Sequence, residues 1–325
     1  MKEFINKVCR KSGTLLDSIP MSIIISFIII LFGQLFGLKL MNLGFVKNFF
    51  IAVTKDDNVA YFISEYLAFI GIWFLIMVVM AVFKRNRPMF KALSYNHNGN
   101  NLKGLLIGLL LGFGTNAFCI LISVLTKNIH LSFNGIDPLL ITLFFIAVFI
   151  QSSGEELASR MHMYQKLRRR YKNPKVAIII NMFMFMLLHA LNPGFSPIAA
   201  LQLCLVAIIF SLLVYYYDSL WAAMAFHAMW NYTQNIIFGL PNSGIVSAYS
   251  IFKLEAASAT DGLFYNVNFG VEGSIGSSLV LLVVLGVILY LNKGKKEKVD
   301  LWADLEREEE LKLQEKELQN ETTSN

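Results

Sequence analysis

Long apolar runs, separated by short polar segments, make up most of the chain. A run of about 20 apolar residues can cross the ~30 Å hydrocarbon core of a bilayer as a helix. The runs predict about eight membrane-spanning helices, at residues 21–40, 58–83, 104–125, 138–167, 175–190, 197–217, 219–238 and 274–291. Residues 45–53 are apolar but too few to cross, so we expect them at the interface or outside. The pattern therefore predicts an all-α fold, a polytopic membrane helix bundle.

Composition supports this interpretation. Of the 325 residues, 56% are hydrophobic and 15% are charged, whereas about a quarter of an average soluble domain is charged. The net charge of +6 does not indicate nucleic-acid binding, because the Lys and Arg residues gather in short segments between the apolar runs. Cys9, Cys119 and Cys204 have neither metal-site nor disulfide spacing. We therefore expect an integral, multi-pass membrane protein whose surroundings are the lipid bilayer, with no nucleic-acid partner.

Lys and Arg are distributed unevenly between the two sides of the predicted spans. Of the 28, 22 lie in residues 1–20, 84–103, 161–175 and 291–325, 5 lie in the alternate segments, and Arg160 lies within the fourth span. Cytoplasmic loops carry an excess of Lys and Arg. The first span follows a long basic segment and has no small-residue cleavage pattern after it, so we expect it to be retained. Both termini are therefore expected in the cytoplasm.

These spans divide the chain into five segments. We expect transmembrane helices 1–3 in residues 1–137, a core of helices 4–7 in 138–238, an extracellular loop in 239–273, transmembrane helix 8 in 274–292 and a charged cytoplasmic tail in 293–325. The tail has an irregular stripe of leucines, which is typical of a solvated helix; a coiled coil that binds a protein partner is the alternative.

Small residues mark one expected packing face. Gly104, Gly108 and Gly112 recur at intervals of four at the start of the third span. Such a ladder lets two membrane helices approach closely. We therefore expect a second helix to pack against this face.

Three ionisable residues end the fourth apolar run, namely Glu155, Glu156 and Arg160. A charged side chain at bilayer depth costs about 2.5–3.5 kcal/mol, so such residues usually face a protein interior or a water cavity and mark function. Glu156 and Arg160 are four apart on one helix face and are expected to form a structural ion pair. Glu155 points elsewhere and is left free.

Other polar residues in the spans are expected at a similar depth. At ~1.5 Å per residue, Glu155 lies about 18 Å and His189 about 21 Å from the cytoplasmic ends of their helices. By the same rise, His227 and Asn231 lie about 12 Å and 18 Å from theirs. Each alone could be an interhelical hydrogen-bond contact. Their joint depth predicts a buried polar site between helices four, five and seven.

The remaining ionisable residues of interest have simpler interpretations. Glu65, early in the second span, is expected to reach the lipid headgroups. His162 is close to a basic loop and is expected at the interface. His97 and His130 lie in loops, and their positions give no indication of a functional role.

The chemistry that such a layer suits is hydrolysis. A carboxylate in a low-dielectric site is a stronger base than in water, and beside a neutral His it can take a proton from water. Glu155 and His189 would hold that water, and His227 with Asn231 could donate to a tetrahedral oxyanion from one helix face. No Ser or Cys at this depth has a matching base. The scissile bond is expected to be an amide.

Three short motifs carry a resemblance to a known family. They are Glu155-Glu156-Leu157-Ala158-Ser159-Arg160 (EExxxR), Phe185-Met186-Leu187-Leu188-His189 (FxxxH) and His227-Ala228-Met229-Trp230-Asn231 (HxxxN). In order and spacing they resemble the motifs of the CPBP family (CaaX protease and bacteriocin-processing, or Abi) of intramembrane proteases, typified by type II CaaX prenyl endopeptidases. The resemblance covers residues 138–238. The departures lie outside the motifs, in the loop 239–273 and the tail from Lys293.

The resemblance implies a role for each matched residue. Water activation would fall to Glu155 and His189, and oxyanion stabilisation to His227 and Asn231. The supporting positions are Glu156 and Arg160, which orient the motif helix, and Phe185. The implied substrate is a hydrophobic or lipidated peptide. Bacterial members are tied to bacteriocin immunity, peptide processing and regulation, so we expect a bacterial cell membrane.

A catalytic zinc held by Glu155, His189 and His227, with water in the fourth position, is a second interpretation of the same residues. A ligating His usually donates to a further acceptor, and the sequence offers no spare carboxylate at this depth, because Glu156 is paired with Arg160. A His-Glu-x-x-His helix is also absent from the sequence. We therefore favour a metal-independent mechanism without a cofactor, with zinc as the alternative.

Two other classes of function stay open at this point. A catalytically silent scaffold or regulator could use the same fold and bind a partner, such as a sensor kinase, through the charged tail. A small transporter could use midplane His and Glu residues, but it predicts an internal repeat, and the two halves of the sequence do not correspond. The complete motif set favours the enzyme.

Overall fold

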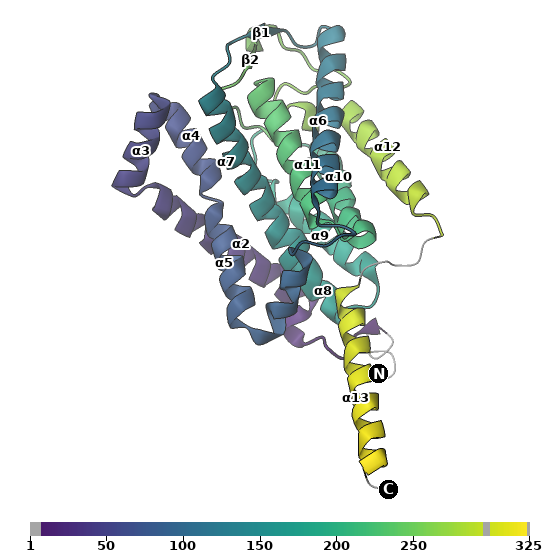
Figure 1. Ribbon diagram of the computed structural model, residues 1–325. Coiled ribbons are helices and arrows are strands. Elements are labelled where there is room, and N and C mark those ends of the chain that lie inside the picture. Colours follow the sequence, from purple (N-terminus) through teal and green to yellow (C-terminus); the bar gives the residue numbers. More distant parts are fainter. Residues whose placement is uncertain (1–7, 295–299, 324–325) are drawn as a thin grey trace.

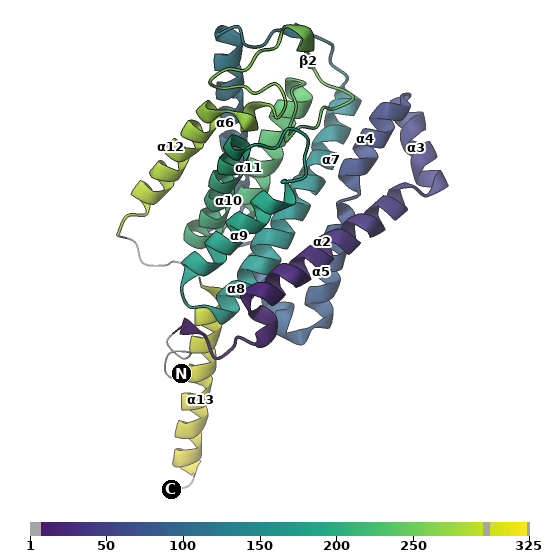
Figure 2. The same ribbon diagram turned by 180° about the vertical axis from the view of Figure 1, so that it is seen from behind.

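The computed structural model describes residues 8–294 and 300–323, and helices make up most of them (Figures 1 and 2). The basic residues predicted for the cytoplasmic ends at Lys2, Lys7, Lys295, Lys296 and Lys298 lie outside the described residues. The α-helices are α2 (Ile19–Met41), α3 (Gly44–Thr54), α4 (Asp57–Leu67), α5 (Ile70–Val82), α6 (Leu102–Leu125), α7 (Pro138–Glu156), α8 (Tyr164–Arg170), α9 (Pro174–Leu188), α10 (Pro197–Tyr217), α11 (Leu220–Tyr232), α12 (Ile275–Leu291) and α13 (Leu301–Thr323). The predicted all-α bundle is confirmed.

Shorter elements complete the description. The 3-10 turns are η1 (Leu15–Asp17), η2 (Lys84–Ala92), η5 (Ala256–Ser258) and η6 (Val271–Gly273). Two segments are π-helical, η3 (Leu157–Met163) and η4 (Thr233–Ile237). The strands are β1 (Leu131–Phe133) and β2 (Phe252–Leu254).

Five helical segments of the described chain are long and apolar enough to cross a membrane. They are Ile19–Met41, Asp57–Val82, Leu102–Leu125, Pro138–Arg170 and Pro197–Tyr217. The apolar helices α9 and α12 are shorter, with 15 and 17 residues. The chain is thus a multi-pass membrane protein, while the count of eight spans and their orientation stay predictions.

Polar caps start three helices that carry the site. Asp137 accepts hydrogen bonds from the Leu139 and Leu140 amides at the start of α7. Asn173 and Ser196 cap α9 and α10 in the same way. A proline follows each cap, where its missing N–H costs nothing and its fixed φ suits a helix. These starts set the register in which each helix presents polar residues to its neighbours.

Helix α11 lies at the centre of the core and packs against α6, α7 and α10 (Figure 1). A Cβ at Gly108 would lie 2.4 Å from the Ala222 carbonyl oxygen, and one at Gly112 would lie 2.4 Å from that of Phe226. The predicted glycine packing face is therefore real, and its partner is α11. This close approach buries α11, whose His227 and Asn231 side chains are turned away from α6 toward the site.

The predicted loop 239–273 is folded against the bundle. Its strand β2 pairs antiparallel with β1, with Phe252 opposite Phe133. The ribbon lies at one end of the bundle in both views (Figures 1 and 2). Gly270 has φ +81°, and a Cβ there would lie 1.9 Å from the Pro241 carbonyl oxygen, so only glycine fits. The turn holds the two ends of the loop together over the core.

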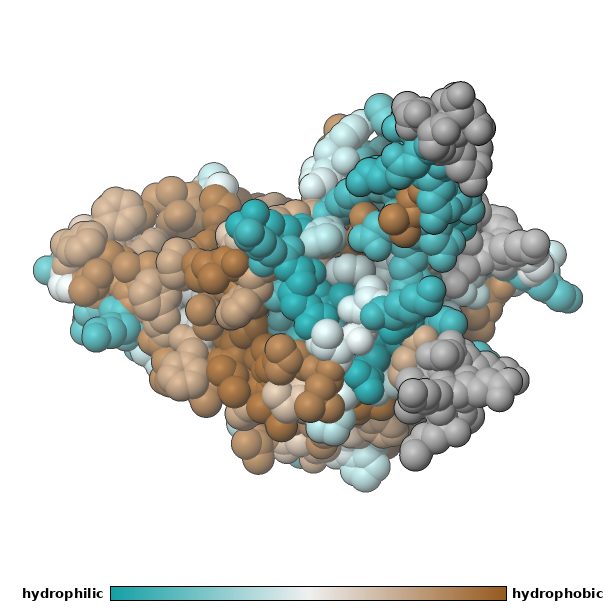
Figure 3. Space-filling model, turned by 90° about the horizontal axis from the view of Figure 1, so that it is seen from below, coloured by the Kyte–Doolittle hydropathy of each residue, from teal (hydrophilic) through white to brown (hydrophobic). Residues whose placement is uncertain are grey.

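The tail begins with a docked segment at the opposite end of the bundle. Asp300 accepts hydrogen bonds from Arg10 and Arg168, and the buried Trp302 ring lies 5.0 Å from the Arg169 guanidinium carbon. From Arg307 the described side chains of α13 are exposed, and the helix projects from the body (Figure 1). Viewed from this end, the surface has a band of hydrophilic residues with hydrophobic residues beside it (Figure 3). The prediction of a wholly solvated tail helix is thus wrong for its first turn, which ion pairs and the Trp302 side chain anchor.

Replacing Asp218 with Asn is expected to stabilise the protein above pH 6. Asp218, between α10 and α11, has φ 50°, a conformation that Asn tolerates. Burial raises the pKa of Asp218 from 3.8 to about 6, assisted by the Asp304 charge and opposed by a hydrogen bond from Asn96. The folded state therefore binds this proton more tightly than the unfolded state, and wild-type stability falls as pH rises from about 4 through 6.

Thermal melts in detergent measure this difference. Asp218→Asn should melt at a higher temperature than wild type at pH 8 and within error of it at pH 4. Asp304→Asn, which removes only the neighbouring charge, is the matched control and should shift the melt less. Equal shifts of Asp218→Asn at both pH values would contradict the role of Asp218 titration.

Candidate active site

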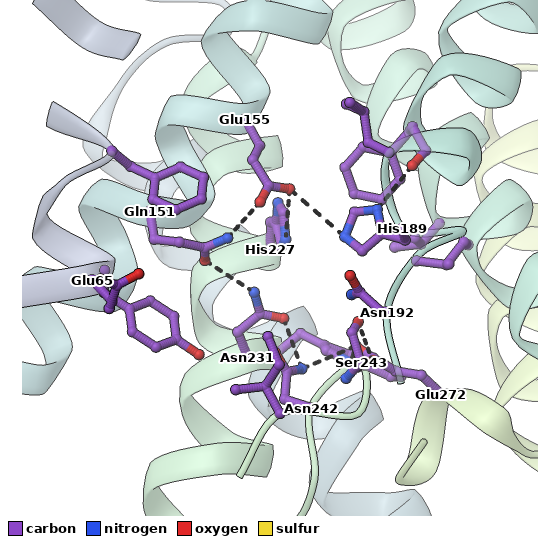
Figure 4. A pocket seen from close by; sticks show the side chains of 18 of the residues that line it. Glu65, Gln151, Glu155, His189, Asn192, His227, Asn231, Asn242, Ser243 and Glu272 are labelled. Carbon is purple, nitrogen blue, oxygen red and sulfur yellow. Dashed lines mark hydrogen bonds and ion pairs between the residues drawn. The ribbon is translucent and has the colours of Figure 1, made fainter. Parts of the chain in front are cut away.

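A cavity of about 470 Å³ lies between α4, α7, α9, α10 and α11 and the folded loop (Figure 4). The structure brings the four residues predicted from their depth into its wall, namely Glu155, His189, His227 and Asn231. Six further polar residues line it that the sequence did not single out, namely Gln151, Asn192, Gln202, Asn242, Ser243 and Glu272. The predicted layer is therefore one continuous polar site, which includes loop residues.

Glu155 faces both histidines. Its Oε2 atom lies 4.0 Å from His189 Nε2 and 4.0 Å from His227 Nε2 (Figure 4). Its Oε1 atom accepts a hydrogen bond of 2.5 Å from the Gln151 side chain, one helical turn earlier. Oε2 has no hydrogen-bond partner among the described residues. The Gln151 hydrogen bond to Oε1 thus holds the carboxylate in place, and Oε2 remains available to accept a hydrogen bond.

The hydrogen bonds of the two rings decide which nitrogens face Glu155. His189 Nδ1 lies 2.8 Å from the Phe185 carbonyl oxygen, and His227 Nδ1 lies 3.0 Å from Glu156 Oε1. Both partners accept hydrogen bonds, so each Nδ1 carries a proton, and in the neutral ring each Nε2 is a bare acceptor. Glu155 Oε2 and the two Nε2 atoms are therefore hydrogen-bond acceptors that face one another in the cavity. A hydrogen-bond donor could bind between them.

Glu156 is paired with Arg160 as expected, and both side chains are fully buried. Arg160 donates to Glu156 Oε1 at 3.1 Å and to the Ala207 carbonyl oxygen at 3.1 Å. The expectation that this pair leaves no carboxylate for a histidine is wrong, because the same Oε1 atom also accepts from His227. One oxygen can serve both donors because α11 packs against α7 and brings His227 to the inner face of Glu156.

Aromatic rings fix the orientation of these groups. The Phe185 ring lies 4.7 Å below the Arg160 guanidinium carbon and 4.8 Å from the His189 ring centre. The Phe210 ring stacks on His227 at 5.4 Å. Phe185 thus contacts Arg160 and His189 through its ring and holds His189 through its carbonyl. Rigid apolar contacts of this kind restrict the rotamers of the site residues.

The helix of the Glu-Glu motif changes character at the site. Directly after Glu156 it becomes the π-helical turn η3, all of whose residues are buried. Such turns are frequent at functional sites, and a regular helix was expected here. His162, expected at the interface, is fully buried and shares a 3.0 Å hydrogen bond with Ser26. That expectation is wrong because α2 crosses η3 and covers His162.

Glu65 is half-buried and also lines the cavity, while its predicted reach to the lipid headgroups stays a prediction (Figure 4). The helix α4 packs against α7 through Val59 and Ile63, which lie on another face of α4 from Glu65. Of the residues missed, Gln151 had a local signal, because it lies one helical turn before Glu155 on the same face. Asn242, Ser243 and Glu272 had none, since only the fold of the loop brings them to the cavity.

Asn231 is held from two sides. Its Nδ2 atom donates to Ser152 Oγ at 3.2 Å and to Gln151 Oε1 at 3.4 Å. Its Oδ1 atom accepts from Asn242 Nδ2 at 3.1 Å, and Asn242 in turn donates to the buried Glu272. Burial raises the pKa of Glu272, and the hydrogen bonds from Ser243 oppose that shift. The Asn231 amide is therefore oriented by its neighbours.

Glu155, His189 and His227 can be compared with the ligands of a zinc site by their hydrogen bonds and by their distances. Both histidines have the Nδ1 acceptors that ligating histidines usually have. Four atoms about 2.1 Å from a tetrahedral zinc would lie about 3.4 Å apart, whereas Glu155 Oε2 lies 4.0 Å from each Nε2 atom. Among residues 8–294 and 300–323, no group of three or more His, Cys, Asp and Glu side chains has the arrangement of a metal site.

Fold and site together define a multi-pass membrane protein with a carboxylate and two histidines gathered at an internal cavity. Residues 137–233 match the family model described as Rce1-like, "Type II CAAX prenyl endopeptidase Rce1-like". No curated protein and no solved structure matches the chain. Residues 137–233 are therefore similar to the CPBP/CaaX protease family, and at the level of the family this match supports a CAAX-type intramembrane peptidase. The match contains all three motifs and ends before the folded loop.

Proposed function

We propose that the protein is an intramembrane endopeptidase that hydrolyses a peptide bond with water activated by Glu155 and His189. The observation that carries the proposal is the approach of Glu155 Oε2 to the Nε2 atoms of His189 and His227, 4.0 Å from each. Two acceptors this far apart can share one water at hydrogen-bond distances of about 2.8 Å. The family match of residues 137–233 supports the same class of reaction.

The proposed reaction follows from these groups. Glu155 takes a proton from the shared water as the oxygen bonds to the substrate carbonyl carbon, while His189 Nε2 accepts from the same water and orients it. A tetrahedral oxyanion forms. Glu155 then gives its proton to the leaving nitrogen as the C–N bond breaks, which returns the carboxylate. No group of the protein is consumed.

Stabilisation of the oxyanion would come from α11. The Asn231 Nδ2 atom, whose two hydrogen bonds are long, can exchange one of them for the oxyanion. His227 can donate from Nε2 only as the doubly protonated ring, because its Nδ1 proton is committed to Glu156. The proposed roles of His227 and Asn231 therefore differ. Asn231 can donate to the oxyanion while His227 is neutral, whereas His227 can donate from Nε2 only when its ring is doubly protonated.

The proposed substrate is a membrane-associated, hydrophobic or lipidated peptide. Apolar side chains form much of the cavity wall, including Leu203, Val206, Phe210 and Ile245. Such a wall suits apolar residues on either side of the scissile bond. A comparison of membrane-associated and secreted peptides from cells that carry wild type or Glu155→Ala tests the proposal. Peptides should accumulate uncleaved in the variant; identical peptide sets would refute a peptidase.

The proposed mechanism needs no metal ion. We expect purified protein to retain its activity, within about twofold, after exhaustive chelation, because Glu155 and His189 alone hold the water. Cleavage of the identified peptide is measured alongside metal content. Loss of cleavage that zinc alone restores, at one zinc per chain, would replace this mechanism with a zinc site of Glu155, His189 and His227.

A membrane scaffold or regulator is the second candidate, and the exposed part of α13 favours it. This helix carries mixed charges and projects from the bundle beyond its docked first turn (Figure 1). Removing residues 307–325 separates the candidates, because that change leaves the Asp300 and Trp302 contacts intact. Peptidase activity should persist in the truncated protein, whereas a phenotype lost with the tail and kept in Glu155→Ala would favour the scaffold.

A further inference from the structure

Glu272 is a buried carboxylate outside the family-matched segment, yet it lies in the wall of the cavity. Its Oε2 atom accepts from the Ser243 amide at 2.6 Å and the Ser243 hydroxyl at 2.7 Å. Its Oε1 atom accepts from Trp230 Nε1 and Asn242 Nδ2, each at 3.0 Å. Four donors thus surround one carboxylate, which joins the loop to α11 next to Asn231.

These bonds have a direction. Glu272 Oε1 accepts from the Trp230 indole N–H, which can only donate, so the Asn242 side chain must also turn its NH2 group toward this oxygen. The same Nδ2 atom lies 3.1 Å from Asn231 Oδ1, which must therefore be the acceptor (Figure 4). With its oxygen committed to the loop, the Asn231 amide presents its NH2 group on the opposite side, toward Gln151 and the cavity. The carboxylate thus determines which end of the Asn231 amide faces the reacting groups.

This orientation matters for the chemistry. An oxyanion needs a donor, and a flipped amide would present an oxygen and repel it. The two orientations of an Asn side chain are nearly equal in shape, so packing alone distinguishes them poorly. The chain of hydrogen bonds makes the flipped form unfavourable. Flipping would place Asn231 Oδ1 against the acceptor Gln151 Oε1, and Asn231 Nδ2 against the donor Asn242 Nδ2.

We propose that Glu272 and Asn242 are positioning residues for the peptidase, which hold the Asn231 amide with its NH2 group toward the oxyanion. This role rests on the proposed function. It makes the folded loop 239–273 part of the active site, although the loop lies outside the family match. Neither residue touches the scissile bond; both act through Asn231.

Steady-state kinetics of single and double variants test the positioning role. Asn242→Ala is expected to lower kcat about 10–100-fold with little change in KM, since one oxyanion donor is worth about 10²–10³ in kcat and its loss here is partial. Glu272→Gln, which keeps the size but can donate, should lower kcat similarly. Because Asn242 acts through Asn231, the double variant Asn231→Ala/Asn242→Ala should have the kcat of Asn231→Ala alone.

Two controls separate positioning from a structural role. Ser258→Ala, exposed in the same loop and outside the cavity wall, should match wild type. Melting temperature is measured for every variant, and a Glu272→Gln that fails to fold is replaced by Asn242→Ala. Wild-type kcat in Asn242→Ala, or losses that multiply in the double variant, would overturn the proposal.

A substrate-free measurement keeps the two proposals distinguishable. In protein labelled with 15N-asparagine, the Asn231 side-chain NH2 signal should shift in Glu272→Gln and stay in place in Ser258→Ala. An unchanged signal in Glu272→Gln would overturn the positioning role even with an active enzyme. Equal inactivity of wild type and Glu155→Ala, with the signal shifted, would instead refute the peptidase and leave the coupling between Glu272 and Asn231 intact.

Discussion

Glu155→Ala is expected to abolish peptide hydrolysis and to leave the protein folded in the membrane. A general base contributes about 10²–10⁴-fold to the rate, and here it also orients the attacking water. Its removal should cost little stability, because among the residues that the structure describes Glu155 Oε2 has no hydrogen-bond partner and Oε1 accepts from Gln151 alone. Cleavage of a peptide identified in cells, measured with purified protein under single-turnover conditions, gives the rate.

His189→Ala should be inactive to a similar degree, because the two residues hold one water. Groups that act as a unit are strongly non-additive, so Glu155→Ala/His189→Ala should be no slower than either single variant. Glu255→Gln, exposed on the folded loop, is a control for loss of a carboxylate and should match wild type. Retained cleavage in purified Glu155→Ala would end the assignment of Glu155 as the base.

Glu156→Gln is expected to lose both stability and activity. Glu156 and Arg160 are fully buried, and breaking a buried ion pair by removing one partner typically costs about 3–5 kcal/mol. The same change weakens the hydrogen bond that orients His227. Thermal unfolding in detergent and peptide cleavage are measured on the same preparation, and both should fall below the wild-type values.

A paired replacement distinguishes the two effects of Glu156. Replacing a whole buried ion pair with apolar residues of similar volume is often neutral or stabilising. Glu156→Leu/Arg160→Met should therefore recover much of the melting temperature lost in Glu156→Gln, while activity stays low because His227 has no acceptor. A Glu156→Gln variant that melts like wild type would argue against the ion pair, and an active Leu/Met variant would argue against the orienting role.

The apolar runs by themselves determined that this is an all-α membrane protein. A segment of ~20 apolar residues has few alternatives to a membrane helix, since every backbone polar group must be satisfied within it. Spacing also determined local pairs, such as Glu156 with Arg160, because residues four apart in a helix share a face. The same rule identifies the glycine ladder of α6 as a packing face, while its partner α11 is set by the fold.

The alignment of Glu155, His189, His227 and Asn231 in one layer could be predicted because helix rise converts sequence position into depth. Helix rise does not say how each helix is rotated about its axis, and that rotation decides which side chains face the protein interior. The sequence therefore placed His162 at the interface, whereas α2 packs over it and buries it. This packing partner is not close in sequence, so no local pattern reports it.

Tertiary structure alone decided the hydrogen bonds that give the site its chemistry. That His227 shares Glu156 with Arg160 depends on the packing of α11 against α7, 71 residues away in the chain. That Glu272 reaches Asn231 through Asn242 depends on a loop whose sequence is polar and without periodicity. Sequence determines helices through interactions one turn apart; the direction of a buried amide or imidazole depends on partners that only the folded chain brings together.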